Sequence, residues 1–137
     1  MAIVEELLRT EANGTISFGN HKLAQKTKKE DYEHLGDLYK VKTYQEITKL
    51  EKNGMLLYES VPGTSVLDFK ESSDGVEFVV EGDEDVQLTV GLKEDTEYEV
   101  FVDGKSTGKM GTGFGGKLNI SVALEAAGEV TVKVVQA

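Results

Sequence analysis

The second half of this sequence alternates apolar and polar residues with a period of two, and this pattern restricts the chain to β-structure. It recurs in the stretches Val76–Val80, Val86–Leu92, Tyr98–Val102, Leu118–Leu124 and Val130–Val134. Successive side chains of a strand point to opposite faces, so each stretch directs one apolar set into a core. The β-branched and aromatic residues that dominate these stretches also suit a pleated, half-buried surface.

Turn signals separate these stretches. Asp74-Gly75 and Asp103-Gly104 lie between alternating runs, and Asp-Gly is typical of hairpin turns. Short strands with a turn about every ten residues indicate a sandwich or barrel. We therefore predict an all-β fold, with an immunoglobulin-like or jelly-roll-type β-sandwich of six or seven strands over residues 64–137. The Cys–Trp–Cys signature of true immunoglobulin domains is absent.

The first half is predicted to add an N-terminal β unit of hairpins over residues 1–63. Asn13-Gly14 precedes a strand at Thr15–Phe18, Leu38–Thr48 is rich in β-formers, and Asn53-Gly54 turns the chain into Met55–Ser60. Pro62-Gly63 marks the predicted boundary between the two units.

Two stretches of the first half are ambiguous. The apolar residues of Ile3–Arg9 fit a helix face, but they also fit a strand paired with Thr15–Phe18, which the following Asn-Gly favours. Gln25–Asp37 is the most polar stretch, and we expect a loop there, with at most one helical turn.

Composition excludes several classes of function. The 137 residues include no cysteine, which rules out disulfides, thiolate metal sites and cysteine nucleophiles. The net charge of −10 opposes binding to nucleic acid and to anionic membranes. No signal peptide is visible and no apolar run approaches the roughly 18 residues of a membrane span, so we expect a cytoplasmic protein.

The charge is distributed unevenly along the chain. Residues 20–54 carry eight lysines against six acids, whereas residues 59–103 carry fourteen acids against two lysines. The simpler interpretation is two solvated surfaces. The alternative is head-to-tail attraction between copies, because complementary patches steer association.

The sequence predicts no catalytic residue, no metal site and no cofactor. His21 and His34 do not have metal-binding spacing, and no nucleophile elbow is present. Glu59, Asp68 and Glu77 have apolar neighbours, but each is expected on the solvent face of a strand.

Two loops resemble ligand sites at first inspection. The acidic run at residues 81–85 could offer oxygen ligands to calcium, but it lacks the spacing of an EF-hand and is better interpreted as an acidic hairpin turn. The glycine run at residues 111–117 resembles a phosphate loop, but a strand follows it where a phosphate loop needs a helix, which indicates a flexible β–β loop.

Aromatic residues supply the possible contact sites. Phe114 stands at the tip of the glycine run and is a candidate for self-assembly or ligand contact. Tyr39, Tyr44 and Tyr58, together with Tyr32, could stack against sugars, but half-buried positions in a sheet are the better explanation for most of them.

Four segments resemble a family of small proteins from Gram-positive anaerobes, some of which carry the label endosialidase. They are Thr15–Asn20, Gly36–Thr43, Tyr58–Thr64 and Gly115–Leu118. The resemblance extends over nearly the whole chain and implies a small β module akin to accessory domains of carbohydrate enzymes. It transfers no catalytic residue, because this chain has one arginine and no tryptophan.

Three classes of function remain. The first is a non-catalytic structural protein that self-associates into a homo-oligomer or filament, since open strand edges invite pairing. The second is a carbohydrate-binding accessory module with a glycan as its partner. The third and least supported is a hydrolase.

Overall fold

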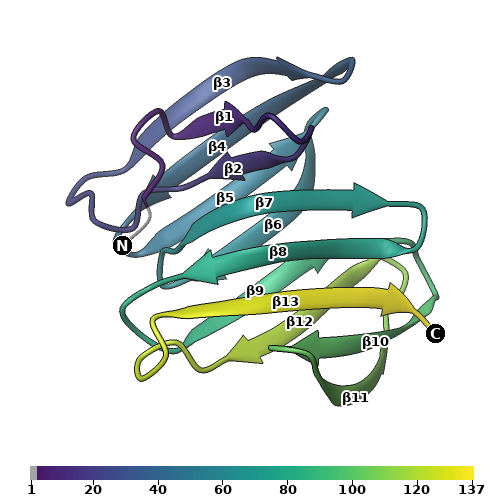
Figure 1. Cartoon of the computed structure of the whole chain (residues 1–137). Helices are drawn as coiled ribbons and strands as arrows, with labels where there is room; N and C mark the ends of the chain where they lie inside the picture. Colours follow the sequence, from purple (N-terminus) through teal and green to yellow (C-terminus); the bar gives the residue numbers. More distant parts are fainter. Residues whose placement is uncertain (1–2) are drawn as a thin grey trace.

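The computed structural model describes residues 3–137, which form two antiparallel β-sheets packed as a sandwich (Figure 1). The strands of the first half are β1 (Leu8–Thr10), β2 (Ile16–Phe18), β3 (Thr27–His34), β4 (Asp37–Tyr44), β5 (Ile47–Lys52) and β6 (Met55–Val61). Those of the second half are β7 (Ser65–Ser72), β8 (Gly75–Glu81), β9 (Val86–Gly91), β10 (Glu97–Val102), β11 (Lys105–Gly111), β12 (Lys117–Val122) and β13 (Glu129–Gln136). The described residues contain no helix that could cross a membrane.

The two sheets have seven and six strands. The larger has the order β1-β2-β7-β8-β13-β10-β11, and the smaller has the order β12-β9-β6-β5-β4-β3. Six of the twelve connections between described strands cross from one sheet to the other. The all-β sandwich predicted from the alternating pattern is therefore confirmed, with seven strands after residue 64.

The core lies between the sheets and is filled by one face of each. In β9 the apolar residues Val86, Leu88 and Val90 are buried, and the residues between them are more exposed. An aromatic cluster joins the sheets, because the Tyr58 ring meets Phe18 at 5.3 Å and Phe78 at 5.5 Å, both edge to face. Such pairs add stability beyond the area they bury.

Both sheets contain strands from both sides of Pro62. β2 pairs with β7 in the seven-stranded sheet, and β6 pairs with β9 in the six-stranded sheet. The predicted division into residues 1–63 and 64–137 is thus not a division between sheets, and the described parts of both segments share one hydrophobic core.

The polar stretch Gln25–Asp37 is mostly strand rather than loop, so this prediction was wrong. β3 occupies Thr27–His34 at the edge of the six-stranded sheet, paired with β4 alone. Only His34 of this strand is buried, so β3 carries few apolar residues and shows no alternating signal. A bulge between Lys29 and Tyr32, with Asp31 at φ 56°, disrupts the pattern further.

The predicted single strand at Leu38–Thr48 is two strands. β4 ends at Tyr44 and β5 begins at Ile47, and the two residues between them are Gln45 and Glu46. Gln-Glu carries no turn signal, so the break was not visible in the sequence. Backbone contacts from outside the hairpin hold it, because Gln45 donates to the Leu23 carbonyl and accepts from the Gly63 N–H.

Ile3–Arg9 does not form a helix. Its strand portion begins only at Leu8, where β1 pairs with β2 as the Asn13-Gly14 signal indicated. The fully buried Val4 donates its N–H to the Gly19 carbonyl, which ties the preceding segment to the sandwich.

The turns gather at two ends of the sandwich. The Asn53 end holds the turns β1–β2, β3–β4, β5–β6 and β7–β8 and the loops 92–96 and 112–116. The Pro62 end holds the loop 19–26, the turns β4–β5, β6–β7 and β10–β11, and the loops 82–85 and 123–128. The C-terminus lies at the Asn53 end (Figure 1).

Candidate functional site

A pocket of about 330 Å³ opens between the two sheets at the Asn53 end. The seven-stranded sheet contributes the β1–β2 turn and the end of β7, and the six-stranded sheet contributes β3, β4 and β5. The polar side chains that line it include Asn13, Thr15, His34, Asp37, Tyr39, Lys52, Lys70 and Glu71. Apolar contact surface comes from Ile16, Leu35 and Phe69. A concave apolar surface with a few convergent polar groups is typical of ligand sites.

Lys52 links two carboxylates in this pocket. Its Nζ lies 2.8 Å from Glu71 Oε1 and 3.8 Å from Asp37 Oδ2. The second oxygen of Asp37 accepts a hydrogen bond of 2.8 Å from Asn53 Nδ2. The hydrogen bond to Glu71 raises the pKa of Lys52, so the ammonium group stays charged. The positive charges of Lys52 and Lys70 balance the negative charges of Asp37 and Glu71. The lysines and carboxylates of the pocket therefore have no net charge.

Tyr39 and His34 form the inner aromatic surface of the pocket. Tyr39 is opposite Lys52 in the β4–β5 register, and its ring meets that of His34 edge to face at 5.8 Å. Both side chains are largely buried. Burial raises the pKa of Tyr39, so its hydroxyl stays protonated and can donate a hydrogen bond. His34 Nδ1 lies 3.2 Å from Thr10 Oγ1.

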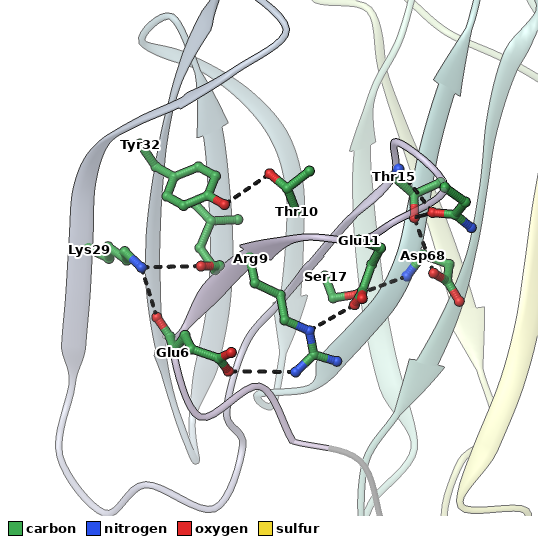
Figure 2. Close-up of polar contacts among 11 residues, drawn as sticks. Glu6, Arg9, Thr10, Glu11, Thr15, Ser17, Lys29, Tyr32 and Asp68 are labelled. Atoms are coloured by element: carbon green, nitrogen blue, oxygen red, sulfur yellow. Dashed lines mark hydrogen bonds and ion pairs between the residues drawn. The ribbon is translucent and has the colours of Figure 1, made fainter.

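The β1–β2 turn forms one wall of the pocket, and polar contacts fix it in place (Figure 2). Asn13 Oδ1 accepts hydrogen bonds from the Thr15 N–H at 3.1 Å and from the Thr15 hydroxyl at 2.6 Å. The same hydroxyl lies 3.1 Å from Asp68 Oδ1 on β7. The wall is therefore held by its own turn and by the neighbouring strand.

Glu11 organises the other side of this hairpin (Figure 2). Its Oε2 accepts hydrogen bonds from the Ser17 hydroxyl at 2.5 Å and from Arg9 Nε at 2.8 Å. These two bonds lower the pKa of Glu11 and keep it ionised, and the bond from Ser17 has the larger effect. Ser17 Oγ in turn accepts the Asp68 N–H, so the cluster joins β1, β2 and β7.

β1 and β3 belong to different sheets, and side chains of β3 bridge the gap between them. Lys29 donates to the backbone carbonyls of Glu6 at 3.3 Å and Leu8 at 3.2 Å. The Tyr32 hydroxyl lies 2.9 Å from Thr10 Oγ1 (Figure 2). These contacts close the side of the sandwich next to the pocket.

The structure places the predicted contact residues in four different settings. Tyr39 lines the pocket. Tyr44 is half-buried beside the β4–β5 turn at the opposite end. Tyr58 is fully buried in the aromatic cluster and cannot present a face to a ligand. Phe114 stands 87% exposed at the tip of loop 112–116.

The two loops that resembled ligand sites are connections between the sheets. Residues 82–85 lead from β8 to β9 in the other sheet, so they do not form the predicted hairpin turn. Loop 112–116 is the predicted β–β connection, and it is fastened by Thr112 Oγ1, which donates to the Lys93 carbonyl, and by the Gly113 carbonyl, which accepts the Asp95 N–H. Glu59, Asp68 and Glu77 have partly or largely exposed side chains.

Sequence reasoning missed Asp37, Lys52 and Glu71. They are distant in sequence, and each is an ordinary charged residue at the end of a strand, so no local pattern marks them. Only the pairing of β4 with β5 and the packing of the two sheets bring them together.

Within residues 3–137, no group of three or more histidine, aspartate or glutamate side chains is placed to hold a metal ion. Comparison with protein-family models, curated proteins and solved structures finds no match for this chain.

Proposed function

We propose that this protein is a non-catalytic binding module that holds a neutral sugar in the pocket between Tyr39 and Lys52. The observation that carries the proposal is the fixed arrangement of Lys52 between Asp37 and Glu71 beside a protonated tyrosine. Carboxylates accept hydrogen bonds, whereas the ammonium and phenol groups donate them. Adjacent sugar hydroxyls need both kinds of partner, and preorganised groups bind at a lower entropic cost.

The charge balance of the pocket favours a neutral ligand over an acidic one. A carboxylated sugar such as sialic acid would place its anion near Asp37 and Glu71, whose charges Lys52 already neutralises. The proposal therefore keeps the carbohydrate context that the endosialidase-labelled family implies, without sialic-acid specificity. An immunoglobulin-like or jelly-roll-type classification and a cytoplasmic location are further parts of the proposal, and the lack of cysteine supports the latter.

A glycan array tests this function. We expect hits among neutral glycans, and weaker binding or none to their sialylated forms. Lys52→Met should weaken binding of a hit about tenfold or more, because both carboxylates lose their shared partner. Lys49→Met is the matched control, since Lys49 lies on the same strand, pairs with Glu51 and does not line the pocket. An array without hits, or equal losses in both variants, would remove the proposal.

Self-association is a second candidate, and a separate observation favours it. Leu35, Met55 and Phe114 are 82%, 74% and 87% exposed, and all three lie at the Asn53 end. Exposed apolar groups at turn tips are suited to contact with another protein surface. Pairing through strand edges is less favoured for β3 and β11, because each carries lysines and an irregular register.

Native mass at high protein concentration tests self-association. We expect an oligomer in the wild type and a shift toward monomer in Phe114→Ser. Val61→Ser is the control, since Val61 is also exposed but lies at the Pro62 end. A wild-type monomer at low and at high salt would end this candidate.

A further inference from the structure

A second pocket of about 330 Å³ lies at the Pro62 end, away from the site described above. It is lined by His21, Lys22, Gln45, Gly63, Asp83 and Glu84, with Pro62 beside them. Loop 19–26, the β4–β5 and β6–β7 turns and loop 82–85 all contribute to it. It shares no lining residue with the pocket at the Asn53 end, which is called the Tyr39 pocket below.

Within residues 3–137, one ring nitrogen of His21 has no hydrogen-bond partner. The residue is only 4% exposed, and its Nδ1 lies 2.7 Å from the buried Ser65 Oγ. Its Nε2 is buried and makes no hydrogen bond to any described residue. The nearest charged oxygen is Asp83 Oδ2 at 3.8 Å, which is too long for a hydrogen bond. Buried polar groups almost always have a hydrogen-bond partner, so the unpaired His21 Nε2 is unusual.

The contacts of Ser65 indicate which nitrogen carries the proton. Ser65 Oγ accepts the backbone N–H of His21 at 3.4 Å, which leaves its own proton free for His21 Nδ1. In the neutral ring the proton then sits on Nε2 and points toward the carboxylate of Asp83. Burial lowers the pKa of His21, which favours this neutral form, while the Asp83 charge opposes the lowering.

We propose that this pocket binds a small neutral molecule through a hydroxyl group that accepts a hydrogen bond from His21 Nε2 and donates one to Asp83. A hydroxyl is the simplest group that does both. The ligand is neutral because Lys22 Nζ already lies 2.7 Å from Asp83 Oδ2 and balances its charge. The Asp83 side chain is half exposed, so it can move to admit the ligand.

A metal ion fits this pocket less well. Lys22 contacts the same carboxylate oxygen that a cation would need, and the two positive charges would repel each other. A metal would also need the lone pair of Nε2, which the arrangement around Ser65 assigns to Nδ1.

Nuclear magnetic resonance of the two histidine rings tests the inference. The 15N-labelled protein is titrated at pH 7.5 with glycerol, methyl β-glucoside and methyl α-mannoside. We expect a protonated Nε2 in His21 and a saturable shift of its ring signals with at least one probe. Asp83→Ala should weaken that response about tenfold or more, whereas Asp74→Ala, an exposed aspartate at the other end, should not.

His34 serves as the internal control, because it lies in the Tyr39 pocket. A response at His34 alone would support the proposed function and overturn this inference, whereas a response at His21 alone would support this inference and leave the proposed function to the glycan array. Protonation at Nδ1, an unchanged response in Asp83→Ala, or a response of His21 to Zn²⁺ but to none of the three probes would also overturn it.

Discussion

At the scale of single residues, two buried polar side chains at the Pro62 end, Tyr58 and His21, differ in their hydrogen bonding. The Tyr58 hydroxyl lies 2.7 Å from Thr64 Oγ1, which in turn lies 2.8 Å from Ser60 Oγ. Burial raises the pKa of Tyr58 far above its usual range, so it stays neutral. Among the described residues, His21 finds a hydrogen-bond partner for one ring nitrogen only. The first arrangement stabilises the core, and the second makes stability depend on pH.

The lowered pKa of His21 predicts a loss of stability in mild acid. An unfolded histidine takes up a proton below about pH 6.5, whereas the folded state requires a lower pH. Between these two values the unfolded state binds more protons, so the free energy of unfolding falls as the pH falls, by up to about 1.4 kcal/mol per pH unit. Urea unfolding from pH 8 to pH 5 measures this. In His21→Gln this contribution to the pH dependence of the free energy of unfolding should be absent. A pH dependence equal to that of the wild type would contradict the lowered pKa of His21.

At the scale of elements, the short β1–β2 hairpin is held by side chains as well as by its ladder. β1 has three residues and, among the described strands, pairs with β2 alone. Glu11, Arg9 and Ser17 fasten it to β7, and Lys29 fastens it to β3. Because the hairpin walls the Tyr39 pocket, its polar cluster also supports the candidate site.

Ser17→Ala tests this fastening. The change removes the donor to Glu11 and the acceptor for the Asp68 N–H, so we expect a loss of about 1–2 kcal/mol in the free energy of unfolding. Amide exchange should become faster mainly in β1. Ser121→Ala is the control, because Ser121 is an exposed residue bonded to Gln87. Equal effects of the two changes would contradict the role of the cluster.

The β3–β4 turn offers a gain in stability. Leu35 and Gly36 both have positive φ, at 51° and 85°, and leucine is strained in this region. Leu35→Asn should raise the free energy of unfolding by roughly 0.5–1 kcal/mol, because asparagine tolerates this conformation. Leu38→Asn, at a neighbouring exposed position without positive φ, should give no such gain in thermal unfolding. A stabilised Leu38→Asn would indicate a general effect of polarity instead.

The alternating pattern predicted the strands with one face in the core well, including the edge strand β12, and missed the exposed strand β3. β8, β9, β10, β12 and β13 follow their expected stretches closely, because each has one face in the core. β3 was missed because its exposed, charged residues show no alternation, and the β4–β5 break was missed because Gln45 and Glu46 carry no turn signal. Tyr39 was named from the sequence, but Asp37, Lys52 and Glu71 meet it only through sheet packing.

At the scale of the whole molecule, the uneven charge follows the sheet order. The lysine-rich residues 20–54 include β3, β4 and β5, which are neighbours at one side of the six-stranded sheet. The acidic residues 59–103 are spread over both sheets, from β7 to β10. If copies attract each other through these regions, self-association should weaken as salt rises, because screening shortens the range of charge interactions. Native mass at low and high salt measures this, and a salt-independent oligomer would point to the apolar turn tips instead.

A map of amide chemical shifts during titration with a neutral glycan that the array identifies tests most directly whether the pocket at the Asn53 end is the binding site. We predict that the perturbed amides cluster at the Asn53 end, around Tyr39, Lys52 and Glu71, and that Lys52→Met removes the response. Perturbations confined to the outer sheet faces, or a response that Lys52→Met leaves intact, would contradict the claim that this pocket is the binding site.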